Sequence, residues 1–148
     1  MSKKDINHRF GFLVNEVGRL YGRRFDQLSR QKLGLSRAQC RLIAILARHE
    51  GDVPLTQTEL AERLDLTTMG VASLCKRLEQ GGWVTRRVSS TDSRANEIIL
   101  EPKAIAELKT AHAISDKVQV QALQGLSAEQ REALMAMLRH IHANLTTP

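Results

Sequence analysis

Residues 55–100 read LTQTELAERLDLTTMGVASLCKRLEQGGWVTRRVSSTDSRANEIIL. This stretch opens with two short apolar patterns of helical spacing. Thr56 and Glu59 form a capping box at the start of the first pattern, and Thr67 caps the second. The glycine pair at 81–82 then closes the second pattern. We therefore expect two short helices separated by a tight turn.

The sequence changes to the alternation of β-strands after the glycine pair. Residues 83–88 and 95–100 read as two strands on either side of the polar turn 89–93. The prediction is a hairpin with a charged tip. Two short helices joined by a tight turn and followed at once by a hairpin form a winged helix-turn-helix, whose second helix commonly enters the DNA major groove.

Longer helices are predicted on both sides of this region. An apolar stripe with three- and four-residue steps runs over residues 10–28. The start and stop signals of the flanking helices are Gly34, the Ser36–Gln39 capping box, the pair Gly51-Asp52, Pro102, Gly125 and the Ser127–Gln130 capping box. The first and last helices carry more apolar surface than one winged domain can cover, so we expect a second copy of the chain to cover it.

The charge of the 148-residue chain is unevenly distributed around its net value of +6. Residues 1–48 carry eleven basic and three acidic groups, residues 49–101 carry six and nine, and residues 102–148 carry five and four. Within the acidic middle third, residues 67–94 hold five basic and two acidic groups. This local surplus favours an anionic partner such as nucleic acid.

Several other classes of protein do not fit the sequence. No apolar run approaches the roughly 18 residues of a membrane span, and the first ten residues lack a signal-peptide pattern, so we expect a cytoplasmic protein without membrane contact. Gly-rich phosphate loops and nucleophile elbows are missing, and the histidines lack metal-ligand spacing. We expect no enzyme, no cofactor and no metal. The positions of Cys40 and Cys75 beside apolar stripes favour buried, inert thiols over redox sensors.

The stretch 55–100 resembles the MarR family of transcription regulators. The resemblance rests on the frame ELAERLDL with RLEQGGWV downstream, on the wing motif Asp92-x-Arg94-Ala95 and on the opening Leu35-Ser36-x-x-Gln39. It implies a mainly α-helical fold with a small β-hairpin wing, and it extends in order over the whole chain. The implied organisation is one domain over 1–148, with a winged helix-turn-helix at 35–101 between dimerisation helices at 1–33 and 102–148.

The resemblance also implies a function. A homodimer would bind a pseudo-palindromic site in double-stranded DNA, act as a repressor and respond to a small aromatic effector. Arg94 would enter the minor groove with Asp92 as its orienting partner. The implied DNA-binding residues are Thr67, Thr68, Ser73, Lys76, Arg77, Arg86, Arg87 and Arg94. Because Ser73 stands where family members often have an arginine, we expect phosphate and wing contacts to supply most of the affinity.

Alternative interpretations remain for the function and for several residues. The competing function is a dimeric helical module that binds a small molecule or a protein without reading DNA. The basic first helix is either a solvated face or a contact to the DNA backbone. Tyr21, Phe25 and Arg41 either line an effector site or are ordinary core and surface residues. The position of Trp83 favours packing under the wing over ligand sensing.

Overall fold

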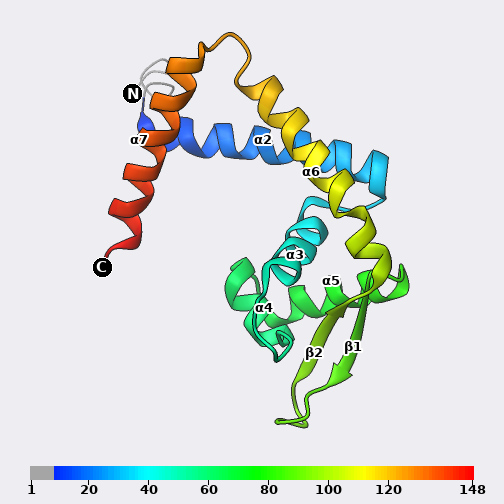
Figure 1. Cartoon of the computed structure of the whole chain (residues 1–148). Coiled ribbons are helices and arrows are strands. Elements are labelled where there is room, and N and C mark those ends of the chain that lie inside the picture. Colours follow the sequence, from blue (N-terminus) through cyan, green and yellow to red (C-terminus); the bar gives the residue numbers. More distant parts are fainter. Residues whose placement is uncertain (1–8) are drawn as a thin grey trace.

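A computed structural model describes residues 9–148 and confirms the expected fold class, α-helical with one β-hairpin (Figure 1). Residues 1–8 of the predicted dimerisation segment 1–33 lie outside the described residues. The elements follow the predicted order: α2 (Phe10–Leu33), α3 (Arg37–Arg48), α4 (Gln57–Leu64), α5 (Thr68–Gln80), β1 (Val84–Val88), β2 (Asn96–Leu100), α6 (Pro102–Ala122) and α7 (Ala128–Thr146).

The predicted capping side chains begin the helices. The Ser36 hydroxyl oxygen accepts a hydrogen bond from the Gln39 amide at 3.1 Å, and the Gln39 side chain accepts one from the Ser36 amide at 2.7 Å. The same reciprocal boxes stand at Thr56 with Glu59 and at Ser127 with Gln130, and Thr67 caps α5. These side chains satisfy amides that a helix leaves without partners in its first turn.

The turn between α4 and α5 is tight because one residue reverses the chain. Asp65 adopts a left-handed conformation with φ 54° and ψ 48°, and the Leu66 amide donates back to the Ala61 carbonyl at 3.0 Å. Aspartate tolerates this conformation better than most residues. The turn lets the inner faces of α4 and α5 meet in the main core.

The main core joins the winged region to the start of α6. Its fully buried members come from α3, α4, α5 and the hairpin, and Ala104 adds the first turn of α6. A smaller cluster of Leu28, Ile114 and Val118 holds α2 against α6. The long helices are therefore attached to the winged region through α3 and α6.

The hairpin is shorter than predicted by one residue at the start of each strand. Trp83 lies outside β1 because its amide donates to the Leu78 carbonyl at 2.9 Å and so continues the turn that ends α5. The strands pair antiparallel, with Val84 opposite Leu100 and Arg87 opposite Glu97. Figure 1 shows the hairpin projecting away from α2, α6 and α7.

One sequence prediction about the helices needs correction. Helix α3 ends at Arg48, before the predicted stop at Gly51. The helix ends there because His49 takes an extended backbone with ψ 122°, and its ring forms a hydrogen bond with the Val53 carbonyl at 2.8 Å. The stripe over residues 10–28 is only partly covered within one chain, in line with the expectation that its apolar surface exceeds what one winged domain can cover. Leu28 is buried, whereas the large apolar side chains of the first half of α2 are exposed: Phe10, Phe12, Leu13, Val14, Val17 and Leu20.

The last helix is exposed in the same way. None of the residues of α7 is buried, and Met135, Met137, Leu138 and Leu145 are among the exposed large apolar side chains. Figure 1 shows α7 at the end of the molecule far from the hairpin. No helix among residues 9–148 is long and apolar enough to cross a membrane.

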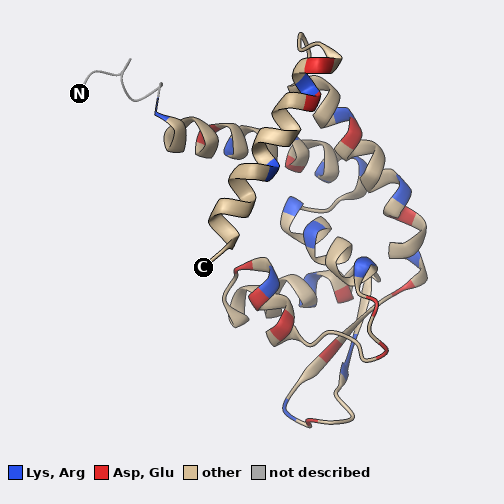
Figure 2. Ribbon diagram, turned by 60° about the vertical axis from the view of Figure 1, so that its left-hand side comes forward, with Lys and Arg blue, Asp and Glu red and all other residues tan. Residues whose placement is uncertain are grey.

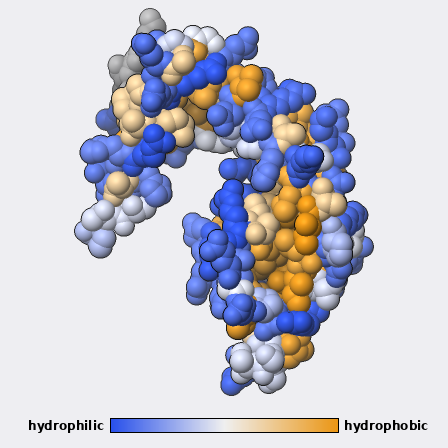
Figure 3. All heavy atoms as spheres, in the orientation of Figure 1, coloured by the Kyte–Doolittle hydropathy of each residue, from blue (hydrophilic) through white to orange (hydrophobic). Residues whose placement is uncertain are grey.

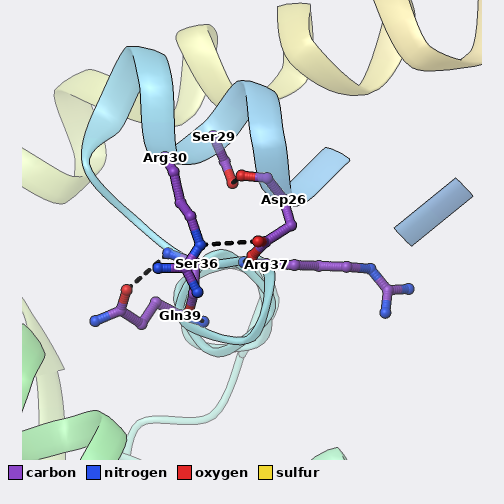
Figure 4. A network of polar contacts seen from close by, with 6 residues as sticks. All are labelled: Asp26, Ser29, Arg30, Ser36, Arg37 and Gln39. Carbon is purple, nitrogen blue, oxygen red and sulfur yellow. Dashed lines mark hydrogen bonds and ion pairs between the residues drawn. The ribbon is translucent and has the colours of Figure 1, made fainter. Parts of the chain in front are cut away.

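A carboxylate of α2 fixes the start of α3 (Figure 4). Asp26 accepts the Arg37 backbone amide at 2.8 Å and the Arg30 side chain at 2.8 Å. The hydrogen bond from the Arg37 backbone amide is the largest cause that lowers the pKa of Asp26 from its ordinary value, and the hydrogen bond from the Arg30 side chain is the second. Asp26 therefore acts as a charged cap, contributed by one helix to the positive end of the next.

We expect Asp26→Asn to reduce the free energy of unfolding by about 0.5–1 kcal/mol at neutral pH, because the amide lacks the charge that favours the helix end. A lowered pKa means that the charged form stabilises the fold above the ordinary aspartate pKa, and this stabilisation is lost as the pH falls through the folded-state pKa. The difference between variant and wild type should therefore disappear in acid. Urea unfolding across pH measures it, with the exposed Asp116→Asn as control. A difference that persists unchanged in acid would contradict the assignment.

Candidate nucleic-acid interface

The outward face of α5 carries the predicted helix contacts. Val71, Cys75 and Leu78 are fully buried on its inner side. The residues left exposed by this burial are Thr67 at the cap and Thr68, Met69, Ser73, Lys76 and Arg77 along the helix. The structure thus places five predicted DNA-binding residues, Thr67, Thr68, Ser73, Lys76 and Arg77, on one accessible surface.

The tip of the hairpin has a defined local structure. The Ser89 hydroxyl oxygen accepts the Thr91 and Asp92 amides at 3.2 and 3.4 Å. An Asp92 carboxylate oxygen accepts the Arg94 amide at 3.0 Å, and the same oxygen lies 4.0 Å from the Arg94 Nε. The Asp92 carboxylate therefore fixes the backbone of Arg94 and lies near its side chain.

Arg94 itself is almost completely exposed. Its side chain keeps 95% of its accessible surface, because it stands at the end of the hairpin beyond the body of the protein. Figure 2 shows the basic and acidic positions of this tip next to each other at the far end of the ribbon. The guanidinium is presented to solvent on a hairpin held by backbone pairing.

Arg86 is bound to α5, a contact that sequence analysis missed. Its side chain donates to Glu79 Oε1 at 3.0 and 3.3 Å, and its backbone amide donates to Glu79 Oε2 at 3.2 Å. Hydrogen bonds from Arg86 lower the pKa of Glu79. The Ile98 amide on the opposite strand donates to Leu55, so both outer edges of the hairpin are tied to the body of the protein.

Arg87 is bound to a buried acid. Its Nε donates to Glu97 Oε2 at 2.9 Å, and only 3% of the Glu97 side chain is exposed. A buried carboxylate needs a cationic or hydrogen-bonding partner, which gives Arg87 a structural role. The two residues face each other across the hairpin, so the strand register is the signal that would have predicted the pair.

The basic residues of this surface therefore differ in their carboxylate partners. Arg86 and Arg87 are each engaged by a glutamate, whereas within residues 9–148 Lys76 and Arg77 form no ion pair. Arg94 has only the long contact to Asp92. Among the described residues of this surface, Lys76, Arg77 and Arg94 are the cations without a close carboxylate partner.

A cavity of about 440 Å³ lies where α2, α3 and α6 meet, and Trp83 forms part of its wall. Tyr21, Phe25 and Arg41 all line it, which the sequence left open. Figure 3 shows hydrophobic side chains gathered over α3 and α6 in this region. The charged lining consists of Arg37, Arg41, Arg48 and Glu107, so cations outnumber anions at this largely apolar cavity.

Trp83 connects the cavity to the end of α5. The Lys103 ammonium lies 4.4 Å from the centre of the indole ring and donates to the Gly81 carbonyl at 2.8 Å. The Trp83 carbonyl accepts the Glu101 amide at 2.9 Å. The start of α6 and the end of α5 are thus joined through one aromatic side chain in the cavity wall.

The two cysteines and the potential metal ligands form no reactive or metal-binding site among residues 9–148. Cys40 and Cys75 are buried free thiols, as predicted, and burial raises the pKa of each. A raised pKa keeps a thiol protonated and unreactive at neutral pH. Among residues 9–148, no group of three His, Cys, Asp or Glu side chains is arranged to hold a metal ion.

The architecture resembles solved structures over nearly the whole chain. The transcriptional regulator PA3341 is 34% identical, with 93% of this chain and 98% of that chain covered and a TM-score of 0.72. MarR from E. coli is 19% identical, with 90% and 96% covered and a TM-score of 0.80. MepR from S. aureus, solved in complex with DNA, is 24% identical, with 92% and 98% covered and a TM-score of 0.76.

The two short helices, the exposed second helix and the docked hairpin define a winged helix-turn-helix protein. The sequence profile of the MarR family matches residues 33–95, within the winged region. The chain belongs to the MarR family of transcriptional regulators.

The link between Glu79 and Arg86 can be tested by amide hydrogen exchange. In Glu79→Ala the Arg86 amide loses its acceptor, and we expect it to exchange about three- to tenfold faster, as the loss of one hydrogen bond implies. Glu62→Ala, on the exposed face of α4, is the matched control and should leave this amide unchanged. Equal exchange of the Arg86 amide in Glu79→Ala and wild type would show that this bond does not hold the hairpin.

Proposed function

We propose that this protein binds a pseudo-palindromic site in double-stranded DNA as a homodimer and represses transcription. The observation that carries the proposal is the exposed Arg94 guanidinium at the tip of a docked hairpin, where Asp92 binds the Arg94 backbone amide and lies 4.0 Å from its Nε. A narrow minor groove concentrates negative potential and attracts such a side chain. Lys76 and Arg77 supply further cations for phosphates, and α5 presents its outward face to the major groove.

The homodimer part of the proposal is supported by the exposed apolar surfaces of α2 and α7. These surfaces lie away from the hairpin and form the largest group of exposed apolar side chains outside the winged region. A two-fold axis through them would place two wings and two copies of α5 on one duplex. Because such a dimer covers a long stretch of promoter, its bound state would exclude polymerase, which supports repression.

We expect Arg94→Ala to weaken binding to the preferred duplex by at least about tenfold, since each dimer loses two groove contacts. Arg94→Lys keeps the charge without the planar guanidinium, so its affinity should be intermediate. Lys109→Ala removes an exposed cation from α6, away from the proposed interface, and is the control. Fluorescence anisotropy with a labelled duplex measures the dissociation constants. If Arg94→Ala binds as tightly as Lys109→Ala, the wing assignment is wrong and the module without DNA reading becomes the better interpretation.

A second part of the proposal concerns an effector. We propose that a small aromatic acid occupies the cavity between α2, α3 and α6 and weakens DNA binding. Aromatic and aliphatic walls suit the ring, and Arg37, Arg41 and Arg48 suit the carboxylate. An occupant that displaces the Trp83 indole would act on the last turn of α5 through Leu78, and on α6 through Lys103.

The effector proposal is tested with benzoate, using the fluorescence of Trp83, the sole tryptophan of the chain. We expect benzoate to change this fluorescence and benzamide, which has no charge, to do so only at higher concentration. Arg41→Ala should weaken the benzoate response, whereas Lys109→Ala should not. Binding linkage requires that benzoate also raise the dissociation constant for DNA. Equal responses to benzoate and benzamide would contradict an anion site.

A further inference from the structure

The first two turns of α5 lack the side chains that read most bases. Residues 68–75 have the sequence TMGVASLC, which contains no arginine, lysine, asparagine or glutamine. Arginine and lysine read guanine in the major groove, and asparagine and glutamine read adenine. The cations Lys76 and Arg77 follow only in the third turn. The start of the helix must therefore read bases with small hydroxyl groups or with apolar surface.

Met69 is the one long side chain on the exposed face of these two turns. It keeps 82% of its accessible surface, while Gly70 and Ala72 beside it are small. A Cβ built on Gly70 would meet only the Thr67 hydroxyl oxygen, at 3.1 Å, so no larger group stands over this part of the helix. Met69 projects from a flat surface, one helical turn before Ser73.

The exposure of Met69 is not explained by the proposed dimer. The exposed apolar side chains of α2 and α7 belong to the proposed dimer surfaces, far from the hairpin in Figure 1. Met69 instead shares the exposed face of α5 with Lys76 and Arg77. An apolar group on the same face as two cations is suited to a polyanion that also offers apolar surface. In the major groove that surface is the C5 methyl group of thymine.

We infer that Met69 reads thymine by packing its thioether chain against the C5 methyl group. This inference rests on the proposed DNA-binding function and adds a specificity-determining residue to it. The flexible, polarisable methionine side chain can follow a methyl group without the directional demands of a hydrogen bond. The preferred half-site then contains a thymine under the start of α5, read by its methyl group.

The test first selects the preferred duplex from a random library with the full-length protein. Each thymine of one half-site is then replaced by deoxyuridine, which removes only the methyl group. For the wild type we expect one such replacement to weaken binding about threefold to fivefold, the effect of one buried methyl-sized group. Met69→Ala should bind the thymine and uracil duplexes equally. Met69→Leu keeps apolar bulk and should retain most of the discrimination.

Lys76→Ala is the control for a general loss of affinity. It should bind both duplexes more weakly but keep the same ratio between them, because a phosphate contact carries no base information. The inference is overturned if the wild type binds every uracil duplex as tightly as the thymine duplex, or if Met69→Ala keeps the full ratio. Either result leaves the proposed function standing as long as Arg94→Ala still weakens binding. If the library yields no bound duplex at all, both proposals fail together.

Discussion

The position of α5 depends on the burial of Val71, Cys75 and Leu78 in the main core. Each of these side chains is fully inaccessible. Burial of a valine or leucine side chain stabilises a fold by about 1.5–3 kcal/mol, so a rotation of α5 that exposed this side would be strongly unfavourable. The core therefore decides which residues of α5 face outward. Thr68, Met69, Ser73, Lys76 and Arg77 are accessible because the opposite face is fixed.

The hairpin depends on the same core through its two edges. Glu79 of α5 binds the outer edge of β1 at Arg86, and Leu55 binds the outer edge of β2 at Ile98. Because Glu79 belongs to α5, the hairpin and α5 are placed relative to each other by a direct contact. A ligand that meets Arg94 at the tip is thereby held in register with α5.

Local sequence signals predicted most of the fold. The caps at Ser36, Thr56, Thr67 and Ser127 act over three residues, so their consequences can be seen in the sequence alone. The burial of α2 could not be predicted in this way. Its apolar spacing is continuous, but only the second half meets α6, and the sequence does not say where two helices cross.

The site was predicted in part, for the same physical reason. Exposure on α5 followed from helical periodicity, and the order of Asp92 and Arg94 followed from the short wing motif. The partners of Arg86 and Arg87 depend on how the hairpin docks and on its register, so a count of charges could not show that both arginines are paired with glutamates. The cavity forms only where three helices cross, and the sequence does not show that crossing. The place of Tyr21, Phe25 and Arg41 in its wall could therefore not be assigned from the sequence.

The central claim is that two copies of this chain bind one duplex, each with α5 in the major groove and Arg94 in the minor groove. Hydroxyl-radical footprinting of the selected duplex, combined with the mass of the complex in solution, tests it most directly. The account predicts two chains per duplex and two symmetric protected half-sites with centres about one helical turn, roughly 10 base pairs, apart. A single protected half-site bound by one chain would contradict it.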